Sequence, residues 1–320
     1  MRSGQNPAKF IEKVERPERV TVVVVTYIPF LAGYFAEGLR VLQICLDSLR
    51  QNTPEPHDLF VFDNGSAPEV VSHLEQSHAE GRINYLFLSS KNLGKGGAWD
   101  IAFPAAPGEI IAYADGDVYF HPRWLSTTMT VLDTFPGVGM VSSRPLRTDP
   151  ELFRATLRWA AGNGEVELER GSFIPWEVFR EHDVNLGQPE EAVRQRYQQT
   201  EDVRLRYRGV EAMAGAVHWQ FVARKEALVQ RLPLALDRPM GQVRTLDERF
   251  DAAGYLRLMT TLPLARHLGN TVPPDLRPPD GSTRSFTPRA GRRHRFLDWG
   301  AVRRLLLALH NQIFRWYFRE

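Results

Sequence analysis

Two aspartates separated by one glycine, Asp115-Gly116-Asp117, follow an apolar segment of the chain. Two carboxylates at the end of a buried strand are unfavourable unless a positive charge neutralises them. Mg²⁺ or Mn²⁺ would do so, because these cations prefer oxygen ligands and also hold diphosphates. An Asp-Gly pair is common in solvated turns as well, so the triplet alone leaves both interpretations open.

A glycine-rich stretch, residues 91–100, is the second group suited to chemistry. Its glycines Gly94, Gly96 and Gly97 allow a ligand to approach the backbone closely, and their N–H groups would suit phosphate oxygens. The stretch lacks the Lys-Ser/Thr pair of a P-loop and does not spell GxGxxG, so by itself it is also compatible with a plain loop. A third candidate, Asp63, would accept hydrogen bonds from a base or a ribose, or would cap the turn that follows it.

Four apolar segments, separated by helical patterns, carry these residues. The predicted strands cover residues 20–27, 59–63, 83–88 and 109–117, and the first predicted helices cover residues 39–53 and 68–80. Alternating strands and helices predict an α/β fold with a mainly parallel sheet flanked by helices. Ligands bind beyond the carboxyl ends of such strands, so Asp63, the glycine-rich stretch, Asp115 and Asp117 are expected to share one crevice.

The composition is that of an ordinary globular protein. Of 320 residues, 43% are apolar, 11% aromatic and 24% charged, which excludes disordered, collagen-like and coiled-coil classes. The net charge of +2 does not indicate a nucleic-acid partner. A single cysteine, Cys45, excludes an intrachain disulfide and a cysteine-based zinc site. Without a recognisable signal peptide or membrane span, the expected location is the cytoplasm.

The distal half is less regular. Residues 144–211 are charged and are expected to be partly helical, whereas residues 216–224 predict a strand and residues 246–253 a helix. A Pro/Arg-rich linker and an amphipathic helix over residues 297–318 end the chain, with nine arginines against two carboxylates from residue 284 onward. This extension would dock on an anionic surface at the inner membrane face, or pack on the rest of the chain or on a second copy.

In this order the motifs resemble the nucleotide-binding half of family 2 glycosyltransferases with the GT-A fold. The resemblance is specific over residues 20–120 and looser up to Asn270. It implies an N-terminal segment 1–19 and a GT-A domain over residues 20–270. That domain would have a nucleotide-sugar half at 20–120 and an acceptor half at 121–270, and the extension 271–320 would follow it.

The resemblance also implies ligands and roles. The donor would be a nucleoside-diphosphate sugar linked to UDP, GDP or dTDP, and the acceptor a saccharide, a lipid-linked sugar or another hydroxyl compound. Asp117, with Asp115, would bind Mn²⁺ or Mg²⁺, and His267 would complete the metal site unless it is simply structural. Donor-binding positions implied by the motifs are Thr26, Tyr27, Asp63, Asn92, Gly94, Gly97, Asp100 and Asp115.

Two residues depart from the family pattern. Asp100 stands where the family motif often has Asn, which makes the donor preference less certain. Lys95 occupies a position that is often aromatic, and it would add a positive charge near the phosphates or face solvent. Residues 213–227 resemble the acceptor strand of the family, and there His218 and Trp219 would contact a sugar or simply pack within the strand.

An inverting transfer needs a general base that deprotonates the acceptor hydroxyl. Asp247 is the expected base and Glu248 the second choice, although the usual Glu-Asp-x-Asp spelling is absent there. A similar pair, Glu201-Asp202, precedes the acceptor strand and is expected to lie on a solvated charged helix.

Two other functions stay open at this stage. A nucleotidyltransferase of related fold would carry a basic glycine-rich loop after its first strand, where this chain has TYIPFLAGYF. A non-catalytic module that binds sugar nucleotides or a membrane surface is compatible with the missing acidic pair.

Overall fold

The computed structural model describes residues 4–11, 13–234, 243–277 and 312 of the chain. The chain divides into two compact units, residues 1–275 and residues 276–320. The C-terminal helix expected over residues 297–318 lies, apart from Gln312, outside the described residues. Its docking on a membrane or on a second copy therefore stays a prediction.

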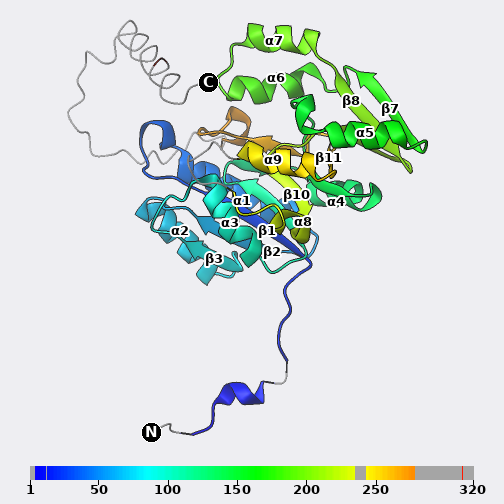
Figure 1. The fold of residues 1–320 in the computed structure, drawn as a ribbon. Coiled ribbons are helices and arrows are strands. Elements are labelled where there is room, and N and C mark those ends of the chain that lie inside the picture. Colours follow the sequence, from blue (N-terminus) through cyan, green and yellow to red (C-terminus); the bar gives the residue numbers. More distant parts are fainter. Residues whose placement is uncertain (1–3, 12, 235–242, 278–311, 313–320) are drawn as a thin grey trace, which may run out of the picture. The chain divides into compact units, whose positions relative to one another are not determined.

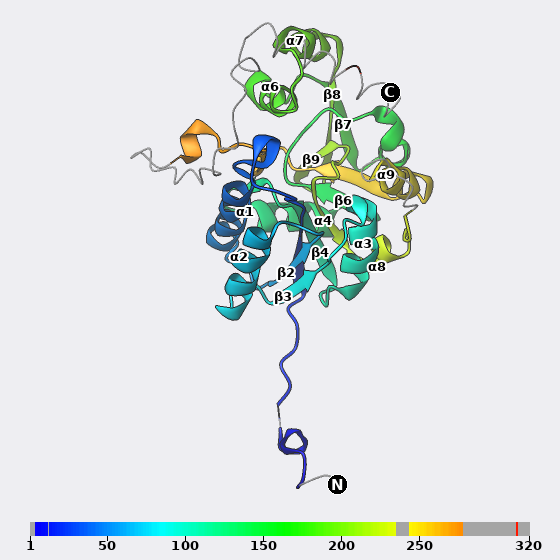
Figure 2. The same cartoon turned by 90° about the vertical axis from the view of Figure 1, so that its left-hand side faces the viewer.

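The first unit is built around a ten-stranded sheet that lies between helices (Figures 1 and 2). The strand order is β3-β2-β1-β4-β10-β6-β11-β9-β8-β7. Seven of these strands run in one direction, and β7, β9 and β10 run against them. The predicted α/β fold with a mainly parallel sheet is confirmed. The strands of this sheet are β1 Val20–Thr26, β2 Asp58–Asp63, β3 Tyr85–Leu88, β4 Ile110–Asp115, β6 Val138–Ser142, β7 Val166–Gly171, β8 Asp202–Tyr207, β9 Val210–Ala214, β10 Gln220–Arg224 and β11 Leu256–Met259.

Helices cover both faces of the sheet. In Figure 2, α1 and α2 lie on one side of the first strands, and α3 and α8 lie on the other. No helix in the described part of the chain has both the length and the apolar character needed to cross a bilayer. The α-helices are α1 Gly38–Asn52, α2 Pro68–Ala79, α3 Gly94–Ala105, α4 Trp124–Thr134, α5 Arg154–Gly162, α6 Trp176–Asn185, α7 Glu190–Gln199, α8 Lys225–Val229 and α9 Val243–Ala252.

The first strand, β1, is buried on both faces. Its side chains alternate between two hydrophobic cores: Val22 and Val24 lie in one, and Val23 and Val25 lie in the other. All seven residues of β1 are buried. Because successive side chains of a strand point to opposite faces, a strand covered on both sides needs a continuous apolar run. This burial fixes the carboxyl end of β1, where the predicted crevice begins.

Gly139 of β6 allows α9 to pack directly on the sheet. A Cβ at this position would collide with the Phe250 ring and lie 2.8 Å from Tyr255 Cβ. We predict that Gly139→Ala lowers the free energy of unfolding by about 1–3 kcal/mol, because the ring must move. Gly162→Ala is the control and should not lower it, since nothing lies within 4 Å of a Cβ there. Urea denaturation measures both, and equal effects would contradict this packing.

Two local expectations were wrong. The glycine-rich stretch is a loop only up to Leu93, because α3 begins at Gly94, whose φ of 70° ends the loop. Gly96 and Gly97 are buried within this helix. The charged segment after α7 does not continue as a helix either: residues 202–207 form β8, which pairs with β7 and β9. Alternate residues of β8 contribute to the core, a pattern that the surrounding charges obscured.

Candidate functional site

The ends of the first three parallel strands meet at one edge of the sheet. Thr26 of β1 is in register with Asp63 of β2, and Val25 of β1 is in register with Asp115 of β4. The N–H of Gly116 donates to the Val25 carbonyl at 3.0 Å, so the chain leaves β4 directly beside β1. The structure thus brings Thr26, Asp63 and Asp115 together, as parallel strands with a common edge require.

Asp63 is buried, and one of its two carboxylate oxygens has no hydrogen-bond partner among the described residues. Its Oδ2 accepts the N–H groups of Gly65 at 3.2 Å and Ser66 at 3.0 Å, which caps the turn after β2. Its Oδ1 is also buried, but has no hydrogen-bond partner among the described residues. A buried carboxylate oxygen without a donor is unfavourable, so a donor from a ligand would stabilise it.

Asn64 is a site residue that sequence analysis identified only as part of a turn. Its Oδ1 accepts the Leu93 N–H at 2.9 Å, and its Nδ2 donates to the Gly94 carbonyl at 3.2 Å and to Asn92 Oδ1 at 3.1 Å. Asn92 Oδ1 in turn accepts the Gly94 N–H at 2.8 Å. These bonds hold the end of β2 against the first turn of α3. The Asn-Gly spelling predicted the turn but could not indicate this partner.

Asp115 is bound through each of its oxygens to a neighbouring side chain. Lys95 Nζ lies 2.7 Å from its Oδ2, and the Tyr113 hydroxyl donates to its Oδ1. Burial, reinforced by the Asp115 charge, raises the pKa of Tyr113, so the phenol stays protonated and acts as a donor. The expected contact of Lys95 with solvent is replaced by this ion pair, in which the lysine side chain is 12% exposed.

Asp117 lies beside His267 because two short strands pair outside the main sheet. These strands are β5 Val118–Phe120 and β12 Ala265–His267, with His267 opposite Val118. His267 Nε2 is 3.3 Å from Asp117 Oδ2. Asp117 Oδ1 and His267 Nδ1 are both buried without a partner in the described part of the chain. Burial raises the pKa of the Asp117 carboxyl, and the positive charges of His267 and Lys95 oppose that rise.

The pair formed by Asp117 and His267 fits a divalent cation that is shared with a substrate. Two ligand atoms bound about 2.1 Å from one cation lie about 3 Å apart, close to the 3.3 Å found here. No cluster of three or more His, Cys, Asp or Glu side chains with metal-binding geometry occurs among the described residues. Mg²⁺-type cations commonly bind one or two protein ligands and complete their shell with phosphates and water.

An aromatic group borders the Asp117–His267 pair. The Trp219 ring lies 5.6 Å from the His267 ring, and His182 of α6 lies 5.8 Å from Trp219 and 6.0 Å from His267. Burial lowers the pKa of His182 to about 3, so its imidazole is neutral near pH 7. Sequence analysis missed His182, because it lies in the charged region where no motif marks it.

Asp247 lies between a buried arginine and a half-exposed histidine. Arg257 Nη2 is 2.7 Å from its Oδ1, and His218 Nδ1 is 3.7 Å from its Oδ2. Arg257 also donates to the carbonyls of Leu152 at 2.7 Å and Ala216 at 2.9 Å. His218 is 42% exposed, whereas Asp247 is 4% exposed, so the histidine is the accessible member of the pair.

The remaining predicted residues lie as follows. Glu248 is exposed and pairs with Arg244 at 3.0 Å on the same helix. The Asp100 carboxylate accepts the Leu234 N–H at 2.9 Å, and burial raises its pKa. Tyr27 is 39% exposed and directly follows β1. These placements leave the roles of Asp100, Tyr27 and Glu248 as predictions.

The carboxylate of Asp202 is occupied by donors from the surrounding chain. Its carboxylate binds Arg147 Nε at 2.6 Å and accepts the N–H groups of Phe173 at 2.7 Å and Ile174 at 2.8 Å. Asp202 is buried, and each of its oxygens has at least one donor. A carboxylate held in this way organises the segment before α6, and the adjacent Glu201 is exposed.

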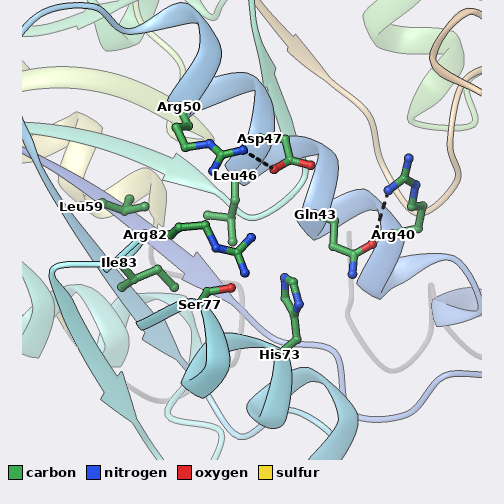
Figure 3. Close-up of a pocket in the computed structure, with 10 residues that line it drawn as sticks. All are labelled: Arg40, Gln43, Leu46, Asp47, Arg50, Leu59, His73, Ser77, Arg82 and Ile83. Carbon is green, nitrogen blue, oxygen red and sulfur yellow. Dashed lines mark hydrogen bonds and ion pairs between the residues drawn. The ribbon is translucent and has the colours of Figure 1, made fainter. Parts of the chain in front are cut away.

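A cavity of about 260 Å³ lies between α1 and α2 (Figure 3). It contains none of the strand-end residues described above. Three arginines line it, and each has a polar partner, which is a carboxylate for Arg50 and Arg82 and a neutral amide for Arg40. The pairs are Arg50–Asp47, Arg82–Glu80 and Arg40–Gln43. We therefore locate the chemistry at the strand ends.

A family model described as "Glycosyl transferase family 2" matches residues 9–196, more than half of the chain. The chain belongs to glycosyl transferase family 2. Among curated proteins, an uncharacterized glycosyltransferase from Nostoc sp. (strain PCC 7120) is 30% identical over 105 residues. That match covers 32% of this family 2 chain and 32% of the relative, so the chain spans about a third of the relative's length.

Two solved structures have folds similar to this family 2 chain. TarS residues 1–349 from S. aureus gives a TM-score of 0.44 at 14% identity, covering 76% of this chain and 58% of that one. A mannosyltransferase from Pyrobaculum calidifontis, solved with GDP-Man and Mn²⁺, gives 0.45 at 18% identity, covering 80% and 60%. At TM-scores below 0.5 these likenesses carry no argument about function.

The match to family 2 ends before the distal site residues. It includes Asp63, Asp115 and Asp117, but stops at residue 196, short of Asp247 and His267. The roles of these last two residues in this family 2 chain are therefore argued from their contacts alone.

Proposed function

We propose that this family 2 chain is a metal-dependent, inverting glycosyltransferase that moves a sugar from a nucleoside-diphosphate sugar to an acceptor hydroxyl. The carrying observation is the contact of Asp117 with His267 at the carboxyl edge of the parallel strands. Both side chains present buried, unpartnered atoms there. A divalent cation would bind His267 Nε2 and the Asp117 carboxylate, and a diphosphate would complete its coordination shell.

Different residues of the chain bind different parts of the donor. Asp63 Oδ1 accepts a hydrogen bond from the nucleoside, since it is the oxygen that the turn leaves free. Asp117 and His267 hold Mn²⁺ or Mg²⁺, which when bound stabilises the negative charge of the departing diphosphate. Asn64 fixes the first turn of α3, from which Lys95 reaches Asp115.

The acceptor side uses Asp247 together with His218. An inverting transfer needs one base at the acceptor hydroxyl, and this pair is the Asp–His contact in the acceptor half. Asp247 is enclosed, so the exposed face of His218 meets the acceptor while the carboxylate orients the ring. Glu248 pairs with Arg244 in solvent and is not part of this pair.

A nucleotide screen tests the proposal. We expect UDP, GDP or dTDP to raise the melting temperature much more with Mn²⁺ or Mg²⁺ than with EDTA, because ligands that bind the native state stabilise it by mass action. A ligand at 100 times its Kd adds about 2.7 kcal/mol to the free energy of unfolding. The matching nucleosides, which lack phosphate, are the control. If no diphosphate with either cation raises the melting temperature, the proposed donor is wrong.

A further inference from the structure

Lys95 is a basic side chain that is held in place at the strand ends. It lies in the first turn of α3, and its ammonium reaches Asp115 at the end of β4 with an Nζ–Oδ2 distance of 2.7 Å. The same ammonium lies 5.4 Å from the centre of the Trp99 ring and 5.5 Å from that of Tyr113. Contacts with a carboxylate and two aromatic rings fix a side chain that is normally flexible.

The two aspartates of the Asp-Gly-Asp motif are consequently in different states. Both oxygens of Asp115 have donors, from Lys95 and from the Tyr113 hydroxyl. Asp117 Oδ1 has none among the described residues. The open carboxylate is therefore Asp117, and the occupied one serves to hold a lysine.

The position of Lys95 supplies hydrogen-bond donors as well as charge. An ammonium has three N–H donors, and one of them is used by Asp115. A diphosphate carries more negative charge than one divalent cation neutralises when two carboxylates lie beside it. A fixed ammonium balances part of that excess, and charge-assisted bonds to phosphate are among the stronger contacts in proteins.

We propose that Lys95 is a built-in cation of the donor site that contacts the diphosphate, with Asp115 as its positioning residue and Asp117 as the cation ligand. This inference rests on the proposed function, because it needs a diphosphate at the strand ends. The chain then neutralises its donor with one exchangeable cation and one permanent charge. Part of the affinity for nucleoside diphosphates is accordingly independent of added metal.

Calorimetric titration tests this inference directly. The full chain is titrated with UDP and with GDP, once in MnCl₂ and once in EDTA. We expect Lys95→Met to weaken diphosphate binding about 10- to 100-fold in Mn²⁺, as the loss of a charge-assisted bond does. In EDTA, we expect the wild type to bind the diphosphates weakly and Lys95→Met not to bind them. Lys95→Arg, which keeps the charge, should recover part of the affinity. Uridine and guanosine should bind all three proteins equally.

Lys225→Met is the matched control. Lys225 also begins a helix and donates to the Ala106 carbonyl at 2.6 Å, but it does not contact a strand-end carboxylate. Its loss should leave diphosphate affinity unchanged. If Lys95→Met is unfolded by circular dichroism, Asp115→Asn, which releases the lysine, takes its place and should weaken binding in the same way.

Three outcomes overturn the inference, and they differ from one another. In the first outcome, wild type and Lys95→Met bind the diphosphate equally well, and Asp117→Asn does not bind it. Lys95 is then only structural. Weakening of nucleoside and diphosphate alike means a general disturbance of the site. If the wild type binds no diphosphate under any condition, the proposed function fails, and this inference fails with it.

Discussion

Asp117→Asn is expected to abolish Mn²⁺-dependent binding of nucleoside diphosphates while the fold remains intact. The amide keeps the shape of the side chain but lacks the negative charge that a divalent cation requires. The ligand pair with His267 is thereby broken, and we expect a loss of at least about 100-fold in affinity. Because the carboxylate has a buried oxygen without a partner, its removal should cost little stability.

A buried aspartate at the opposite edge of the same sheet provides the control. Asp58 begins β2, is 8% exposed and accepts the Glu18 N–H at 2.9 Å. Asp58→Asn should bind UDP or GDP with Mn²⁺ as the wild type does. Titration calorimetry measures the affinities, and circular dichroism measures folding. Undiminished Mn²⁺-dependent binding by folded Asp117→Asn would refute the metal role of this residue.

Asp247→Asn is expected to reduce sugar transfer by about 10²- to 10⁴-fold, because His218 would lose the carboxylate that orients it and general bases contribute in this range. It should also destabilise the chain, because Arg257 is fully buried and would lose its carboxylate. Breaking a buried ion pair from one side costs about 3–5 kcal/mol. Turnover must therefore be measured at a temperature where the variant is folded, with the donor that the nucleotide screen identifies.

Asp202→Asn separates the two effects of the Asp247 substitution. Asp202 is also buried and pairs with the enclosed Arg147, so its loss should destabilise the chain similarly. It has no histidine contact of the kind that Asp247 makes. We expect Asp202→Asn to keep near-normal turnover when folded. Equal losses of turnover in both variants would show that Asp247 acts through stability alone.

The donor half could be predicted because its signals are local. A β-branched run such as residues 20–26 needs burial on both faces, and that requirement selects a central parallel strand without knowledge of distant partners. The convergence of Thr26, Asp63 and Asp115 then follows from strand direction alone. Even here, the start of α3 at Gly94 depended on hydrogen bonds from Asn64, which sequence patterns do not display.

The acceptor half could not be predicted equally well, because its partners lie far apart in the sequence. The buried arginine of the Asp247 pair comes from β11, and the histidine comes from the segment before β10. The resemblance to the family and the predicted start of a helix indicated Asp247 but not these contacts. In the same way, the charges around Asp202 suggested a solvated helix, whereas Arg147 neutralises this residue from 55 positions away. His182 has no local signal of any kind.

The small sheet of β5 and β12 has a consequence for how the molecule is made. Asp117 is translated first, and its neighbour His267 follows about 150 residues later. A nascent chain can fold its amino-terminal strands first, since domains form progressively during synthesis. The Asp117–His267 pair nevertheless exists only after residue 267 has been translated, so a site that needs both side chains can form only late in folding.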